Sequence, residues 1–431
     1  MPGAIASETI PGPSSLPLLG WWDQSMRLAR DPLAFLLARY HRYGSISALM
    51  RDDPAIIFAL GPAANHQMIS HDQAWSSTVG ELASLHTPLE TGHRVEGVVR
   101  RDEADRRSIA VHRDITVSLT QHMLDRWGLG CLIDVSHVMY ELSLQIAVAT
   151  LFGRDRAEAT QQLARVVRRW SHYLTAPLPG LRGRLFVGND GHAHHLATEL
   201  ATIVEVLDDR RHDDTSLRHA VPFLVMAPAW SAAILTWTLF LLGQHPRVLA
   251  DLRAELARVL VGGAPALDQL ADLPVLDRIV KESLRLFPPV SVDCCMLSAA
   301  LELGPYRAPE GTIVVYSPYI THHLPDRYLN PQHFRPERWL YIEPERHEYL
   351  PFGACSNLDD AAAVAVLHTR LILAMVVQRY TLGLAPGARI DPSAGVLLVP
   401  KGRLAMVIAP PDRSVTRRIP QGMVRKMVIL P

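Results

Sequence analysis

Residues 281–289 read KESLRLFPP, and this short stretch decides the fold. Glu282 and Arg285 lie three positions apart in a segment with helical periodicity, so both side chains share one face of the helix. A second stretch, FRPERW at residues 334–339, supplies Arg338, which can complete a buried, hydrogen-bonded ion cluster. Such a cluster is costly to break, because removal of one member leaves a buried charge without a partner. We therefore predict that Glu282, Arg285 and Arg338 form a structural triad.

Periodicity on either side of this stretch predicts a mainly helical chain. Short apolar runs bounded by turn residues predict strands near residues 46–60, 291–317, 395–399 and 403–408. No linker separates these parts, so we expect one mainly α domain with a minor β portion over residues 1–431, with an extended N-terminal segment at 1–20 and a tail at 412–431. The predicted helices cover residues 31–43, 104–127, 135–152, 196–211, 247–261, 275–286 and 361–379.

The stretch from His219 to Pro246 carries no charged residue and is long enough to span a bilayer. It contains Pro222 and Pro228 and stands alone in the middle of the chain, which favours a buried central helix over a membrane span.

Composition excludes several classes of function. The 431 residues include 43 Lys plus Arg and 43 Asp plus Glu, so no charge excess indicates nucleic acid or an anionic membrane surface. The four cysteines show neither a disulfide framework nor a zinc pattern. The N-terminus has no basic segment followed by an apolar one, so no secretory signal is visible. These features predict a cytoplasmic protein.

Five motifs in order resemble the cytochrome P-450 superfamily over nearly the whole chain. They imply the fold of that family: a mainly α domain with a minor β portion. The triad then has an architectural role. The motifs are PGPSSLPLLG (11–20), LTWTLFLLGQHPRVLADLRAEL (235–256), KESLRLFPP (281–289), FRPERW (334–339) and PFGACSN (351–357).

The resemblance implies a haem loop of the form Phe-Gly-x-Gly-x-Arg-x-Cys, with the thiolate ligand seven residues after the Phe. Counting from Phe352 leads to Asp359 rather than a cysteine. Ala365 and Tyr380 match the family's pattern after the ligand without a gap. Cys355 falls at a loop glycine, and we interpret it as a small buried thiol rather than a displaced ligand.

Other positions that the resemblance assigns to haem or to dioxygen chemistry have also changed. The acid and the threonine of the central helix fall on Ala229 and Trp230, followed by Ser231. The sequence thus predicts a bacterial homologue that lacks the cysteine ligand and holds no haem. Asp359 as an unusual oxygen ligand to iron is the alternative. The positions implied to contact propionates fall on Asn357, Asp105 and Ile109.

One reading is a non-oxidative enzyme of specialised metabolism, a lyase similar to terpene cyclases that acts on an apolar isoprenoid or a prenyl diphosphate. Trp230 would stabilise a carbocation through its π face, with simple space filling as the alternative. Asp359 and Asp360, with Ser231 nearby, would serve in proton transfer or as metal ligands. The segment DDRRHDD supplies Asp208, Asp209 and Asp213 as candidate ligands of Mg²⁺; a solvated charge run is the alternative.

A second reading is a protein without catalysis that binds and activates a biosynthetic partner such as a glycosyltransferase, as the resemblance to haem-less relatives implies. We would expect such a protein to carry an exposed apolar patch at its partner interface. A third reading is a degenerate monooxygenase, against which the intact Glu282, Arg285 and Arg338 argue.

Overall fold

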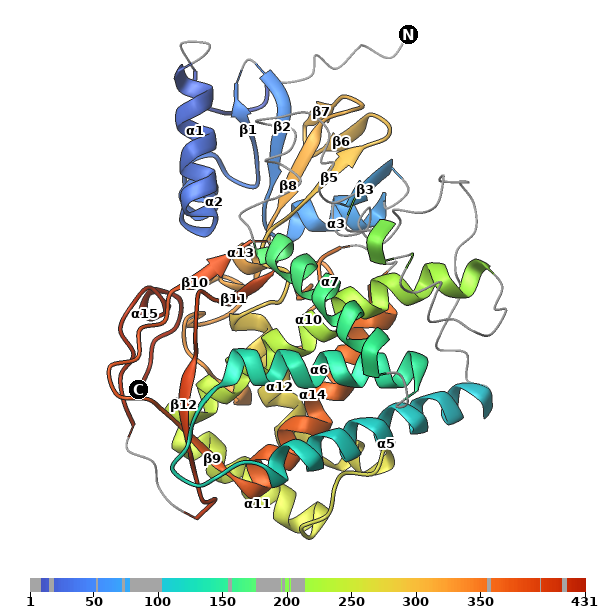
Figure 1. Cartoon of the computed structure of the whole chain (residues 1–431). Coiled ribbons are helices and arrows are strands. Elements are labelled where there is room, and N and C mark those ends of the chain that lie inside the picture. Colours follow the sequence, from blue (N-terminus) through green and yellow to red (C-terminus); the bar gives the residue numbers. More distant parts are fainter. Residues whose placement is uncertain are drawn as a thin grey trace.

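In the part of the chain that it describes, a computed structural model contains many helices and four sheets. Figure 1 shows the largest sheet together with α1 and α2 at one end and the long helices at the other. The residues that the structure describes are 9–14, 19–51, 53–71, 74–77, 103–153, 157–175, 195, 198–200, 202, 214–354, 358–395, 397–412 and 417–431.

Helix α10 (Asp214–Gln244) runs through the centre of the helical part (Figure 1). Every residue from Leu224 to Leu242 is buried, because α6, α7, α12 and α14 surround this apolar segment. The remaining helices are α1 (Leu19–Arg30), α2 (Pro32–Tyr43), α3 (Pro62–Ser70), α5 (Glu103–Asp125), α6 (Val135–Phe152), α7 (Ala157–Thr175), α11 (Pro246–Leu260), α12 (Pro274–Leu286), α13 (Pro318–His322), α14 (Asp359–Arg379) and α15 (Val424–Met427), with 3₁₀ turns η2 (Asp268–Asp272) and η3 (Pro336–Leu340).

The largest sheet has the strand order β1-β2-β8-β5-β3. Its β2 and β8 pair in parallel and its other neighbours pair antiparallel. The sheet joins segments far apart in sequence, since residues near 50, 75, 295 and 315 meet in it. Its strands are β1 (Ile46–Met50), β2 (Asp53–Ala59), β3 (Trp75–Ser77), β5 (Asp293–Leu297) and β8 (Ile313–Tyr316).

Three smaller sheets complete the β portion. The C-terminal segments predicted as strands do form them, but they belong to different sheets: β11 pairs with β10, whereas β12 lies between β4 and β9. Their strands are β4 (Leu132–Asp134), β6 (Leu301–Leu303), β7 (Tyr306–Ala308), β9 (Thr381–Leu384), β10 (Pro392–Ala394), β11 (Leu398–Pro400) and β12 (Ala405–Ala409).

Most predicted helices are present with boundaries close to those expected, and α6 begins and ends where periodicity places it. The predicted helix at 196–211 lies largely outside the described residues.

Three helices of the described part are long and apolar enough to cross a membrane by length and composition alone: Val135–Phe152, Leu224–Gln244 and Asp359–Arg379. The second is buried along its whole candidate window. Its packing on all sides agrees with the predicted central core helix.

Candidate functional site

The structure brings Glu282, Arg285 and Arg338 together in the interior. Arg285 donates to both carboxylate oxygens of Glu282, at 2.9 and 3.0 Å, and Arg338 Nε donates to Glu282 Oε1 at 2.9 Å. The Trp339 indole and the Arg335 backbone N–H also donate to this carboxylate, both at 3.0 Å. The cluster therefore joins α12 to η3 with every carboxylate oxygen satisfied, as an architectural element requires.

Trp230 is fully buried in the middle of α10. Its ring lies 5.0 Å from the ring of Phe352, measured between centroids, and its indole N–H has no hydrogen-bond partner among the described residues. Ser231 donates to the carbonyl of Ala227 at 2.8 Å and lies 3.5 Å from the carbonyl of Ala365 on α14. Here α10 and α14 pack directly against each other.

Asp359 begins α14, but its side chain is 61% exposed and pairs with Arg346 at 3.3 Å. Partial desolvation raises the pKa of Asp359, and the Arg346 charge opposes that rise. Asp360 follows it at the same helix start. Trp230 and Asp359, which were predicted to act in one site, are respectively in the core and at the surface.

The other face of α10 borders a cavity of about 530 Å³. Small side chains open this space, because Ala229, Ala232, Ala233 and Thr236 recur at helical spacing and present no bulk to it. A volume of this size falls in the range of small-molecule sites. The other lining residues come from α6 (Ser136, His137, Tyr140, Glu141), from α7 (Arg168) and from the β10–β11 region (Ser393, Leu397, Val399, Pro400, Lys401, Gly402).

Opposite charges at the rim of this cavity neutralise one another. Arg168 donates through two nitrogens to the two carboxylate oxygens of Glu141, at 2.8 and 2.9 Å, and so links α7 to α6. Tyr140 donates from its hydroxyl to the carbonyl of Val167 at 3.1 Å, which adds a second link. The floor is apolar, whereas the rim carries this paired charge and the exposed Lys401.

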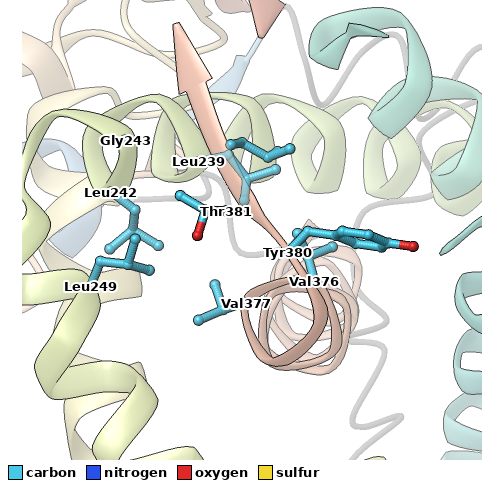
Figure 2. Close-up of a pocket in the computed structure, with 9 residues that line it drawn as sticks. Leu239, Leu242, Gly243, Leu249, Val376, Val377, Tyr380 and Thr381 are labelled. Atoms are coloured by element: carbon cyan, nitrogen blue, oxygen red, sulfur yellow. The ribbon is translucent and has the colours of Figure 1, made fainter. Parts of the chain in front are cut away.

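A second cavity, between α10, α11, α14 and β9, is lined by Leu239, Leu242, Gly243 and their neighbours (Figure 2). Its volume is about 10 Å³. This is near the minimum for one water molecule, so it is a packing defect rather than a ligand site. Trp230, Ser231, Asp359 and Asp360 line neither cavity.

The sequence analysis missed the residues that form the larger cavity. It considered Ala229 only as a lost acid and gave Thr236 no role. The sequence feature that could have indicated the cavity is a stripe of small residues along an otherwise bulky apolar helix. This stripe predicts a cavity only when the positions of α6, α7 and β11 around it are known.

The cytochrome P450 family model matches residues 201–406. A cyclooctat-9-en-7-ol 5-monooxygenase of Streptomyces melanosporofaciens is 28% identical over 87% of this chain and 90% of its own length. This chain belongs to the cytochrome P450 superfamily.

Further relatives of this P450 chain come from the same genus. Cyclooctatin synthase of Streptomyces melanosporofaciens is 26% identical over 92% of this chain and 95% of its own length, and pentalenene oxygenase of Streptomyces avermitilis is 23% identical over 89% and 93%. The solved structure of retinoic acid-bound cyanobacterial CYP120A1 has a TM-score of 0.70 and 21% identity, covering 94% of this chain and all of that one. The cytochrome P450DA heme domain has a TM-score of 0.73 and 19% identity, covering 94% and 98%. These structures establish the P450 fold.

The expectation that the chain holds no haem is wrong on these comparisons. The family to which it belongs consists of haem proteins, a structural neighbour is described as a heme domain, and nothing in the comparisons shows that the cofactor has been lost. Counting motif positions in one sequence could not establish the loss of haem. It shows which residues stand at the motif positions, and not whether the protein binds the cofactor.

The described residues do not by themselves supply a haem ligand. A P450 haem needs a cysteine thiolate, but Cys131 is exposed near β4, and Cys294 and Cys295 are buried in β5. Ile109, one implied propionate contact, is 39% exposed on α5. Cys355 lies outside the described residues.

The predicted magnesium ligands Asp208, Asp209 and Asp213 also lie outside the described residues. Within the part of the chain that the structure describes, no group of three or more His, Cys, Asp or Glu side chains could hold a metal ion. The described residues therefore do not test the magnesium expectation.

Proposed function

We propose that this P450-family protein acts in bacterial specialised metabolism, in the cytoplasm, on an apolar terpenoid that binds in the cavity beside α10. The observation that carries the proposal is the cavity of about 530 Å³ with its floor of Ala229, Ala232 and Ala233. An apolar floor favours a hydrocarbon skeleton, because binding removes apolar surface from water on both partners.

The relatives support this substrate class. Their names describe a monooxygenase of cyclooctat-9-en-7-ol, a cyclooctatin synthase and an oxygenase of pentalenene, and all three cover most of this chain. All three names have the conversion of a terpenoid in common. Trp230 and Asp359 do not line the cavity, so this site does not support carbocation cyclisation.

Binding of farnesene, a terpenoid hydrocarbon, tests the proposal. Equilibrium dialysis gives its dissociation constant for the full-length protein. Ala233→Leu fills the cavity from α10 and Val399→Phe fills it from β11, and each should weaken binding at least about tenfold. Ala254→Leu, on the exposed face of α11, is the matched control and should leave binding unchanged. Equal affinity in all four proteins would show that the ligand binds elsewhere.

A second candidate function is assistance to a protein partner. Leu329, Leu340 and Tyr341 are 71%, 56% and 84% exposed. Arg338, which lies two residues before Leu340 in the sequence, donates to the Leu329 carbonyl. Exposed large apolar side chains are typical of a contact surface where they gather in one patch. Leu340→Ser/Tyr341→Ser should abolish stimulation of a glycosyltransferase while leaving farnesene binding intact; the opposite pattern rejects the candidate.

A further inference from the structure

Thr236 differs from several other hydroxyl residues in the helices of this protein. The hydroxyls of Thr116, Ser231 and Thr369 each donate to the carbonyl four residues earlier in their helix, at 2.7 to 2.8 Å. Thr236 is 2% exposed and lines the cavity, yet its hydroxyl makes no hydrogen bond to another described residue. The Thr236 hydroxyl therefore borders the cavity, where a ligand oxygen can supply a hydrogen bond.

Ser136 provides a second hydroxyl on the opposite wall. It lies in the first turn of α6 and lines the same cavity. Its Oγ is buried and has no hydrogen-bond partner among the described residues. Two hydroxyls from two elements therefore border the cavity, and either can donate to or accept from a ligand oxygen.

The charges at the rim argue against an anionic group on the ligand. Glu141 already occupies two nitrogens of Arg168 through the paired hydrogen bonds, so that guanidinium is neutralised within the protein. Lys401 remains as a single exposed ammonium group, which is little to hold a diphosphate. The unsatisfied groups inside the cavity are neutral and suit a neutral oxygen.

We propose that the cavity binds a terpenoid carrying a neutral oxygen, an alcohol or a ketone, and that Thr236 and Ser136 recognise this oxygen. The inference rests on the proposed function, because it names the substrate class for the same cavity. The hydrocarbon part contacts the alanines of α10, and the oxygen sets the orientation of the ligand through the two hydroxyls.

The test compares three probes that share one carbon skeleton: farnesene, farnesol and farnesyl diphosphate. Wild type should bind farnesol more tightly than either of the others. Thr236→Val keeps the side-chain shape but removes the hydroxyl, and it should weaken farnesol binding roughly threefold to tenfold, the usual range for one hydrogen bond. Ser136→Ala should act in the same direction, and both variants should leave farnesene binding unchanged.

Thr238→Val is the matched control. Thr238 lies on the same helix with a buried hydroxyl that has no partner, but it does not line the cavity, so its loss should change no affinity. Tighter binding of farnesyl diphosphate than of farnesol, or an equal effect of Thr236→Val on farnesol and farnesene, would overturn the inference. Ala233→Leu distinguishes failure of this inference from failure of the proposed function. If this variant leaves farnesene binding intact, the proposed function fails as well.

Discussion

At the scale of single residues, the Glu282 carboxylate organises more of the structure than any other buried acid described here. It accepts five hydrogen bonds, two from Arg285 and one each from Arg338, Trp339 and the Arg335 backbone. Glu282 and Arg285 are fully buried, and Arg338 is 8% exposed. Because all are desolvated, loss of one member leaves the others with charge that water cannot screen.

Glu282→Gln should therefore lower the free energy of unfolding by about 3–5 kcal/mol. Urea denaturation followed by circular dichroism measures this change. Glu343→Gln, at an exposed position in the same C-terminal region, is the control and should stay within about 0.5 kcal/mol of wild type. Similar values for the two variants would mean that the ion cluster adds nothing to stability.

The triad was predictable from sequence, whereas the surroundings of Trp230 were not. Motif spacing fixes which residues share a helix face, and so Glu282 and Arg285 could be paired. Spacing does not show whether a large side chain borders a cavity or packs into the core. Trp230 packs on Phe352, a residue more than a hundred positions away, and this contact depends on how α10 and the segment before α14 come together.

At the scale of elements, α10 has two distinct faces. One packs bulky side chains against α14, and the other presents alanines to the cavity between α6, α7 and β11. The uncharged sequence predicted a buried helix but could not separate these faces, because an apolar residue suits either one. The same limit applies to the C-terminal strands: alternation predicted β11 and β12, but only their positions in space show that they join different sheets.

Gly243, near the end of α10, allows the helix to approach β9 closely. A Cβ at this position would lie 2.8 Å from the carbonyl oxygen of Leu382 and 3.0 Å from the end of the Met406 side chain. The obstacle on the β9 side is backbone, which cannot move aside without disturbing the β9–β12 pairing. The glycine thus sets the distance between the central helix and this sheet.

Two effects predict opposite signs for Gly243→Ala. Helix propensity alone predicts a gain of about 1 kcal/mol, whereas overpacking of a filled interior costs about 1–3 kcal/mol. We expect a net decrease of the unfolding free energy, since a contact at 2.8 Å with backbone must be relieved by movement of a strand. Thermal denaturation gives the sign directly, and a raised melting temperature would show that β9 yields easily.

At the scale of the whole molecule, several histidines are buried in the neutral state. Burial lowers the pKa of His368 to about 3, and the nearby His112 adds to this effect. Burial likewise lowers the pKa of His323 to about 3, with the Arg285 charge as a second cause, and it lowers the pKa of His322 well below its usual value. These residues lie in α14 and around α13, so the effect is distributed over both the helical part and the loops near the triad.

The sign of the resulting pH dependence follows from proton uptake on unfolding. Below a pKa of 6.5 the unfolded chain protonates these imidazoles, whereas the folded chain keeps His323 and His368 neutral down to about pH 3. Stability is therefore complete above pH 6.5 and is lost as the pH falls toward 3. At pH 5 the loss should reach about 2 kcal/mol for each such histidine.

His368→Leu removes one of these groups and should reduce the difference in unfolding free energy between pH 7 and pH 5 by about that amount. The control His41→Gln, at an exposed position of α2, should leave the difference unchanged. Urea denaturation at the two pH values measures both, and an undiminished difference in His368→Leu would show that this buried imidazole takes up its proton without unfolding the protein.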